Sequence, residues 1–277
     1  DMEEVLEYVN NSFESAEEQA AFDVYDANNI NPLYGFFVAR AGLGASESMR
    51  SKLAEYNDPR LSRAFITKQG TSGKEQAPGT ADNAVYAPNG TPEQGTSKYG
   101  TSLFMYSISA PTLLLSYHEL KFLEAEALCR LERDAKSALK DAVVAGLLNA
   151  ENSFTISRKE LGKTLINAAS SITEAEAESY FDNTIEAKYT AEPLKTTMTQ
   201  KYFALWGASG EATESYNDVR RMKGLGENFI ELKNPNSFPL RCPYGNSDTT
   251  TNAEVKAAYG NGQYVYSENV WWAGGSR

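Results

Sequence analysis

The sequence predicts a mainly α-helical fold, in which helices pair as tetratricopeptide-like hairpins and long irregular loops connect them. Three observations lead to this prediction. Apolar residues recur at helical spacing, Ser or Thr stands three residues before Glu at two helix starts, and stretches rich in Gly, Pro, Asn and Thr separate the rest. With 277 residues, 41% of them apolar and 23% charged, the chain can bury a substantial core without a metal or a disulfide framework.

Residues 1–107 are predicted to form a loop-rich helical part. A helix or a pair of helices is expected over 2–25, where apolar side chains recur every three or four positions. The Asn-rich stretch 28–32 ends in proline and predicts a break, because Asn favours turns and Pro restricts the residue before it. A short helix is expected over 46–55, followed by a turn at 57–60.

Residues 108–277 are predicted to form a more regular helical part with an irregular C-terminal tail. Ser116 stands three residues before Glu119, a spacing in which each side chain caps the backbone N–H of the other at a helix start. A second helix is expected over 135–148 after a short connection. Two helices joined in this way form a hairpin of the kind that builds tetratricopeptide-like arrays.

Further helices are expected after this hairpin. They are predicted from 157 or 158 to 169, from 173 to about 189, over 194–206 and over 212–223. Thr173 and Glu176 form a second capping pair, and Gly224 is expected to end the last helix in the left-handed conformation. Beyond residue 234 the chain is rich in Pro, Asn, Thr and Tyr, so we expect it to be irregular.

The stretch 70–101 is the first candidate for a ligand-binding element. It is rich in Gly, Thr, Pro, Ser and Asn, and loops of this length in a compact protein are usually functional or disordered. Tyr86 and Tyr99 lie in it, and tyrosine suits wet binding surfaces because its ring is apolar and its hydroxyl polar. A plain surface loop anchored by buried tyrosines is the open alternative.

Charge and residue inventory argue against nucleic acid and select no catalytic site. The net charge of −11 opposes phosphate binding, and no basic stripe is present. His118 is the only histidine and lies in a predicted helix cap, which favours a structural role over a metal site or a Ser-His-Asp triad. No glycine motif for dinucleotides or phosphates occurs, and none of the 37 acidic residues stands out as a catalytic pair. We therefore predict no catalytic residue, no metal site and no cofactor.

The sequence carries limited information on how the protein is targeted and on whether its two cysteines form a disulfide. Asp1 opens the chain inside a helical pattern, so we expect a mature or truncated chain whose targeting segment has been removed. No stretch approaches the roughly 20 apolar residues that span a bilayer. Cys129 and Cys242 are too few to define a disulfide framework, and both the free and the paired state are possible.

Four segments resemble, in order and spacing, the SusD/RagB family of outer-membrane lipoproteins. They are the stretch into a helix at 111–127, the run Gln-Lys-Tyr-Phe-Ala-Leu at 200–205, the acidic and aromatic run into an arginine pair at 214–221, and the turn Pro-Leu-Arg-Cys-Pro-Tyr at 239–244. The run Asn-Pro-Leu-Tyr at 31–34 suggests the SusD-like subgroup. These motifs belong to the scaffold, so no ligand-contacting residue is transferred from them. Full-length family members are longer, and this chain is expected to lack their N-terminal portion with its lipid-anchoring cysteine.

The resemblance implies a single SusD-like domain over 1–277, in a surface-exposed lipoprotein on the outer membrane of Bacteroidetes-type bacteria. Such a protein works with a SusC-like TonB-dependent transporter and captures glycans or other nutrients without cleaving them. Under this hypothesis Tyr34, Tyr86 and Tyr99 stack on the ligand. Two alternatives stay open, a structural module that docks on the transporter and a carboxylate-dependent glycoside hydrolase.

Overall fold

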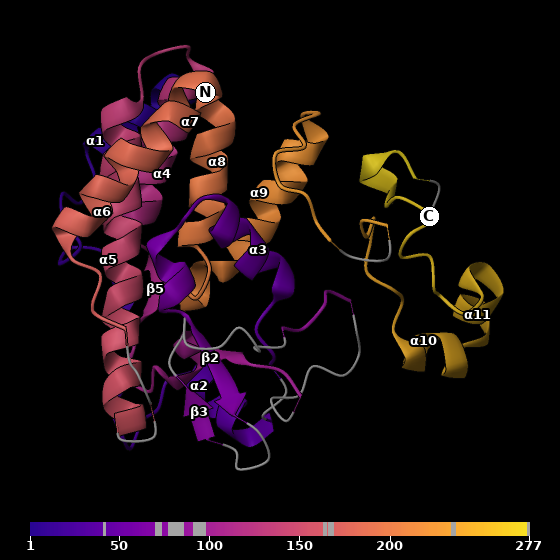
Figure 1. The fold of residues 1–277 in the computed structure, drawn as a ribbon. Coiled ribbons are helices and arrows are strands. Elements are labelled where there is room, and N and C mark those ends of the chain that lie inside the picture. The colour runs from indigo at the N-terminus through magenta and orange to yellow at the C-terminus, as the bar shows by residue number, and fades with distance from the viewer. Residues whose placement is uncertain are drawn as a thin grey trace. The chain divides into compact units, whose positions relative to one another are not determined.

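The computed structural model describes residues 1–40, 43–69, 74–76, 86–90, 98–162, 165, 169–233 and 237–275. The chain divides into two compact units, Asp1–Leu232 and Lys233–Arg277, which we describe separately. Helices dominate and the strands are short, which confirms the predicted mainly α fold (Figure 1). The single domain expected over 1–277 stays a prediction.

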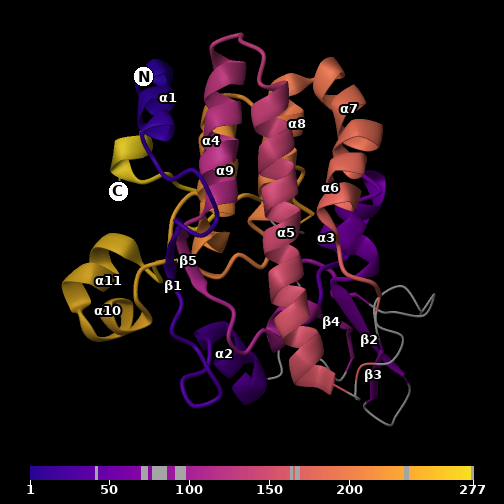
Figure 2. The same cartoon turned by 90° about the vertical axis from the view of Figure 1, so that its left-hand side faces the viewer.

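A helical hairpin forms the centre of the first unit. α4 (Tyr117–Arg130) and α5 (Lys136–Leu161) lie side by side and antiparallel (Figures 1 and 2). The short turn between them contains Glu132, which has a φ of +56°. α8 (Pro193–Ala204) and α1 (Met2–Asn10) pack against α4, so the hairpin is the core around which the other helices assemble.

α5 is one helix of 26 residues where the sequence predicts two. The stretch between the two predicted helices stays helical because its side chains find partners inside the protein. Phe154 is fully buried, and the Ser157 Oγ donates to the Ser153 carbonyl oxygen at 2.9 Å, which leaves the helix backbone intact. Gly162, with a φ of +50°, follows the last helical residue. Residues 163, 164 and 166–168, which belong to the helix predicted from 157 or 158 to 169, lie outside the described residues.

Both predicted N-caps are confirmed. The Ser116 Oγ accepts a hydrogen bond from the Glu119 N–H at 3.1 Å, and the Thr173 Oγ1 accepts one from the Glu176 N–H at 3.2 Å. Each cap satisfies a backbone N–H that a helix start leaves without an intrahelical partner.

The helices that follow Thr173 lie close to their predicted positions. α6 (Glu174–Tyr180) passes through a π-helical turn, η5 (Phe181–Ile185), into α7 (Glu186–Ala191). α9 (Ala212–Gly224) includes the glycine that was expected to end it, so that detail is wrong. Gly226 instead adopts the left-handed conformation with a φ of +78°, because the last turn closes on Leu225 before the chain reverses.

The N-terminal helix is shorter than predicted. α1 ends at Asn10, residues 11–19 form turns, and β1 (Ala20–Phe22) follows, so the helix expected over 2–25 is wrong beyond its first half. β1 pairs antiparallel with β5 (Thr112–Leu115), a partner far along the chain. Apolar spacing within one segment could not reveal that long-range pairing.

The remaining elements of the first unit are short and surround the hairpin. They are α2 (Pro32–Arg40), α3 (Glu47–Glu55), η1 (Pro59–Ser62), β2 (Phe65–Gln69), β3 (Lys74–Gln76), β4 (Thr101–Ser102), η3 (Leu103–Tyr106) and η6 (Ser209–Glu211). The order β3-β2-β4 makes a small antiparallel sheet. α3 confirms the helix expected over 46–55, and η1 begins within the turn expected at 57–60.

Aromatic rings pack where α8 ends. The ring centroid of Trp206 lies 5.3 Å from that of Phe65 and 5.1 Å from that of Phe104. Gly207 follows with a φ of +82°, and a Cβ at that position would lie 2.5 Å from the Phe104 ring. Only glycine fits both the conformation and the space.

We expect Gly207→Ala to lower the free energy of unfolding by about 1–3 kcal/mol, because it adds both backbone strain and a clash in a packed core. Urea unfolding followed by far-UV circular dichroism measures the change. Gly224→Ala is the matched control, since a Cβ there meets nothing within 4 Å and the residue is helical. It is expected to be neutral or stabilising. Equal losses in the two variants would contradict the assignment.

The second unit contains two short helices where an irregular tail was predicted. α10 (Asn246–Thr251) and α11 (Ala253–Tyr259) adjoin, and the Asn252 side chain caps α11. The ring of Tyr244 stacks on that of Tyr259 with centroids 4.3 Å apart. The one-turn η7 (Trp271–Ala273) follows near the end of the chain. In neither unit is a described helix long and apolar enough to cross a membrane.

Candidate functional site

Tyr34 lies on α2 and is half-buried. Its hydroxyl donates a hydrogen bond to the Glu160 Oε1 at 3.0 Å, at the end of α5. Burial, followed by this contact with Glu160, raises the pKa of Tyr34. Phe36 and Val38 on the same helix are 50% and 59% exposed, so α2 has apolar side chains at the surface.

Tyr86 and Tyr99 lie in two described segments of the stretch 70–101, at 86–90 and 98–101. Tyr86 is half-buried, edge-on to Phe65 at 5.4 Å between centroids, with the Arg50 guanidinium 4.9 Å from its ring. Tyr99 is only 5% exposed. These positions fit the alternative of buried anchors, while most of the loop lies outside the described residues. Ligand contact by the tyrosines stays a prediction, and the described contacts join no two of the three.

A groove of about 640 Å³ runs along one face of α5, and we call it the α5 groove. Val144, Ala145 and Leu148 line it from one helical stripe, and Tyr117 lines it from the start of α4. Further lining comes from the turn segment 14–19 and from the first turns of α6. Its size lies in the range of about 300–1,000 Å³ that is typical of ligand pockets.

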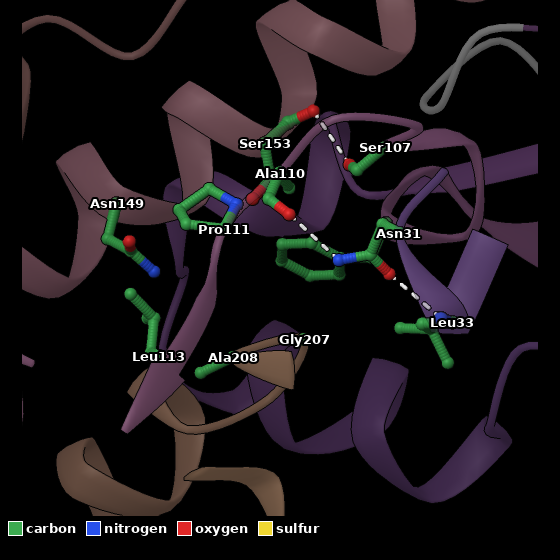
Figure 3. Close-up of a pocket in the computed structure, with 11 residues that line it drawn as sticks. Asn31, Leu33, Ser107, Ala110, Pro111, Leu113, Asn149, Ser153, Gly207 and Ala208 are labelled. Carbon is green, nitrogen blue, oxygen red and sulfur yellow. Dashed lines mark hydrogen bonds between the residues drawn. The ribbon is translucent and has the colours of Figure 1, made fainter. Parts of the chain in front are cut away.

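A second cavity, of about 10 Å³, lies between α2, η3 and α5 (Figure 3). The Asn31 Nδ2 donates to the Ala110 carbonyl oxygen at 2.8 Å, and its Oδ1 accepts from the Leu33 N–H at 2.8 Å. The Asn-Pro pair that predicted a break therefore also starts a helix, with Asn31 as cap and Pro32 as first residue. The space suits about one water molecule and is too small for a nutrient.

A cluster of buried ionisable groups lies where α4 begins. Glu211, from η6, is 2% exposed, and it accepts a hydrogen bond from the Ser116 N–H. Its carboxyl group is also hydrogen-bonded to that of Glu119. His118 is 1% exposed, and its Nε2 lies 3.7 Å from the Glu211 Oε2. The sequence predicted that the Glu119 side chain accepts the hydrogen bond of the Ser116 N–H. In the structure Glu211, 95 residues away from Ser116, accepts it instead.

Burial sets the protonation states in this cluster. It raises the pKa of Glu211 to about 8, and the hydrogen bond and charge of Glu119 add to the effect. Burial also lowers the pKa of His118 to about 3, and the positive charges of Arg60 and Lys201 act in the same direction. At neutral pH the carboxyl pair therefore holds a proton and the imidazole is neutral. A neutral, buried imidazole beside a protonated carboxyl group suits a structural role for His118.

The described residues offer no metal site. Nowhere among them do three or more His, Cys, Asp or Glu side chains converge to hold an ion. Cys129 and Cys242 are both free thiols, the first half-buried and the second exposed.

Residues 1–244 match the model of a protein family described as SusD-like_2, starch-binding associating with outer membrane. The chain belongs to this SusD-like family. A solved SusD/RagB family protein from Bacteroides thetaiotaomicron VPI-5482 is 64% identical with a TM-score of 0.89, and the match covers 100% of this chain and 59% of that one. Comparison with curated protein sequences finds no match.

More distant structures share the fold of this SusD-like chain. A SusD homolog from Bacteroides fragilis NCTC 9343 is 19% identical, with a TM-score of 0.63 over 97% of this chain and 61% of that one. A protein described as chitin-binding is also 19% identical, with a TM-score of 0.60 over 94% of this chain and 56% of that one. This chain therefore spans less than two thirds of the length of each of these three structures.

Residues that carried the SusD-like resemblance build an ion-pair network between helices. The Lys201 Nζ lies 2.8 Å from the Asp218 carboxylate and links α8 to α9. Arg221 binds both oxygens of Glu126, at 2.5 and 2.8 Å, and links α9 to α4. Arg130 adds a third cation, which bonds to the same Glu126 at 2.6 Å. These contacts give the motifs a structural role, in which Arg221 of the arginine pair forms the ion pairs.

Sequence reasoning missed the α5 groove in this SusD-like chain. In the sequence, Val144, Ala145 and Leu148 have the same spacing as a buried helix face. The spacing alone cannot show whether another helix covers that face. Glu174 and Glu178, four residues apart without a basic partner at helical spacing, were a weak signal of an acidic wall.

Proposed function

We propose that this chain is part of a surface-exposed lipoprotein that binds a glycan or another nutrient without cleaving it. The protein delivers that ligand to a SusC-like TonB-dependent transporter in the outer membrane. The match of residues 1–244 to a family described as starch-binding and outer-membrane associated carries this proposal. The chain spans 59% of its 64%-identical relative, so the function is proposed for the whole protein.

The buried carboxyl pair at the start of α4 is not placed for glycoside hydrolysis. A glycosidase needs two carboxyl groups that flank a bound sugar. Glu119 and Glu211 are 6% and 2% exposed and bonded to each other, so they cannot reach a polysaccharide. His118 is equally inaccessible and neutral at neutral pH.

Tyr34, Tyr86 and Tyr99 are the proposed ligand contacts. Tyr34 and Tyr86 keep part of their rings open, and each ring is held in place by a neighbouring side chain. Such pre-ordered rings lose little conformational freedom when a sugar stacks on them. Tyr99 is the most buried of the three, so we propose that it acts from the base of the loop.

Calorimetry with a panel of soluble glycans tests the tyrosines. We expect Tyr34→Ala and Tyr86→Ala each to weaken binding by about tenfold, since a lost aromatic contact costs about 1.4 kcal/mol. Tyr8→Ala is the matched control, because Tyr8 is a 70% exposed tyrosine on α1 outside the proposed contacts. Unchanged binding in both variants would remove these residues from the site. Release of reducing ends from a bound polysaccharide would contradict the non-catalytic proposal.

A further inference from the structure

The α5 groove exposes a continuous helical stripe to a potential partner. Its lining residues on α5 run from Lys140 to Asn152 at positions that share one face of the helix. Val144, Ala145 and Leu148 form the middle of this stripe and are half-buried. The part from Asp141 to Asn152 is roughly 16 Å long, which equals about three helical turns.

The walls of the groove are fixed in place. The Gln19 Oε1 accepts a hydrogen bond from the Tyr117 N–H at 3.2 Å, which ties the segment 14–19 to the start of α4. The next residues enter β1, which is paired with β5. On the other side, the Thr173 cap fixes the start of α6, and α6 packs against α5. The groove therefore exists before any ligand binds, which lowers the entropic cost of binding.

Carboxylates without counter-ions line both walls and one end. They are Glu14, Glu17, Asp141, Glu174 and Glu178. None of the five forms an ion pair with a Lys or Arg among the described residues. Lys140 also lines the groove, but its Nζ already lies 2.8 Å from the Asp182 carboxylate.

Two acidic residues of α5 and α6 that lie outside the groove are paired: Glu151 with Arg158, and Glu176 with Arg63. Asp182 and Glu186, which follow α6, bind Lys140 and Lys136 of α5. Glu192 at the start of α8 binds Lys195. The five groove carboxylates have no such partners, and the negative potential that they create attracts a positively charged occupant.

We propose that the α5 groove docks a basic polypeptide segment of a partner protein. Lysine or arginine side chains of that segment pair with the carboxylates on the two walls, and its small apolar side chains contact Val144, Ala145 and Leu148. This is the arrangement in which an amphipathic segment lies in a helical groove. The proposal goes beyond the nutrient-binding function and does not depend on it.

Two other occupants fit the groove less well. A divalent cation needs several ligands within one coordination sphere, and the described residues provide no such convergence. A neutral sugar has no charge to offset five unpaired carboxylates, whereas a basic segment can pair with several of them at once.

Fluorescence anisotropy with a labelled synthetic peptide tests the proposal. The probe is about 12 residues long, to match three helical turns, and repeats Lys with Ala and Leu. We expect it to bind, with an affinity that falls as salt is raised, while the peptide with Glu in place of Lys does not bind. Both this chain and the full-length protein are titrated.

Variants locate the binding site. Glu174→Gln with Glu178→Gln is expected to weaken binding about fivefold, since two lost ion pairs cost about 1 kcal/mol in total. Leu148→Gln is expected to weaken it by removing the apolar floor. The matched control is Glu4→Gln with Glu7→Gln, which changes the net charge equally on α1 outside the groove, and it should leave binding within about twofold.

Three results would overturn the proposal. Equal weakening in the groove double variant and the α1 double variant would show that only net charge matters. Spermine competing as well as the peptide would indicate a site for small cations. Binding by this chain but not by the full-length protein would show that the longer protein covers the groove with its own residues.

Discussion

Arg60→Ala is expected to lower the free energy of unfolding by about 3–5 kcal/mol, a large share of the stability of a typical domain. Arg60 is 2% exposed, and its Nε and Nη2 bind the two oxygens of Asp58 at 2.9 and 2.7 Å. Its Nη1 donates to the Phe203 carbonyl oxygen at 2.7 Å, at the end of α8. Removing the guanidinium leaves a buried carboxylate without a counter-ion and a buried carbonyl without a donor.

A double variant separates the ion pair from the packing of the side chain. Asp58→Asn with Arg60→Met removes both charges while Asn still accepts the backbone N–H of position 60, which Asp58 now accepts at 2.8 Å. We expect this double variant to be more stable than Arg60→Met alone, because no charge is left buried. Urea unfolding of the three variants measures the difference. Equal stability of the double variant and Arg60→Met would show that the charge of Asp58 does not matter.

Local signals in the sequence predicted the helix starts well. Ser116 and Thr173 cap their helices as expected, because a cap depends on residues within one turn. The turn at 57–60 was also placed correctly, with Asn57 at a φ of +49°. That Arg60 of this turn is buried and spans to α8 could not be predicted, since its partner at Phe203 lies 143 residues away.

Errors in the fold come from the same limit. Helical spacing at 2–25 predicted a helix where β1 forms, because the strand depends on β5. The polar stretch around Ser153 and Ser157 looked like a break between two helices. It stays helical because Ser107, which follows η3, hydrogen-bonds to the Ser153 carbonyl oxygen and to the Ser157 hydroxyl. In each case tertiary contacts outweigh local propensity.

The functional site was less predictable than the fold. The tyrosines were chosen because of residue type and loop composition, and neither property reports burial, which turned out high for Tyr99. The α5 groove requires knowing which helix faces stay uncovered. Its carboxylates come from the turn at 14–19, from α5 and from α6, so only the folded chain brings them together.

Stability is expected to be greatest between about pH 4.5 and 6.5 and to fall on both sides, because two buried groups titrate in opposite senses. Glu211 has a pKa of about 8 in the folded chain against an ordinary value of 4.5. Its stabilisation is complete below pH 4.5 and is lost as the pH rises towards 8. His118 has a pKa of about 3 against 6.5, so its stabilisation is complete above pH 6.5 and is lost as the pH falls towards 3.

The two slopes have similar size, about 1.4 kcal/mol per pH unit for one proton, and cancel where they overlap. Above pH 6.5 only the loss from Glu211 remains, so the free energy of unfolding should decline up to about pH 8. Urea midpoints at several pH values, with the m-value checked for constancy because the chain has two units, measure this profile.

Glu211→Gln isolates the alkaline side of the profile. The amide keeps the acceptor for the Ser116 N–H and can donate to the Glu119 carboxylate, but it has no proton to lose. The decline between pH 6.5 and 8 should therefore disappear, while the acid side that depends on His118 should remain. Glu4→Gln, which removes an exposed carboxylate of α1, should leave the whole profile unchanged.

Parallel profiles for the wild type and Glu211→Gln above pH 6.5 would assign the decline to other groups. Glu119 and His118 on α4 face Glu211, and Lys201 on α8 with Glu214 and Asp218 on α9 act on Glu119 beside it. Although burial raises the pKa of Glu119, Lys201, which is paired with Asp218 at 2.8 Å, acts to lower it and so favours ionisation of Glu119 before that of Glu211. Burial of the second charge and repulsion between the Glu119 and Glu211 carboxylates are therefore the expected causes of the decline.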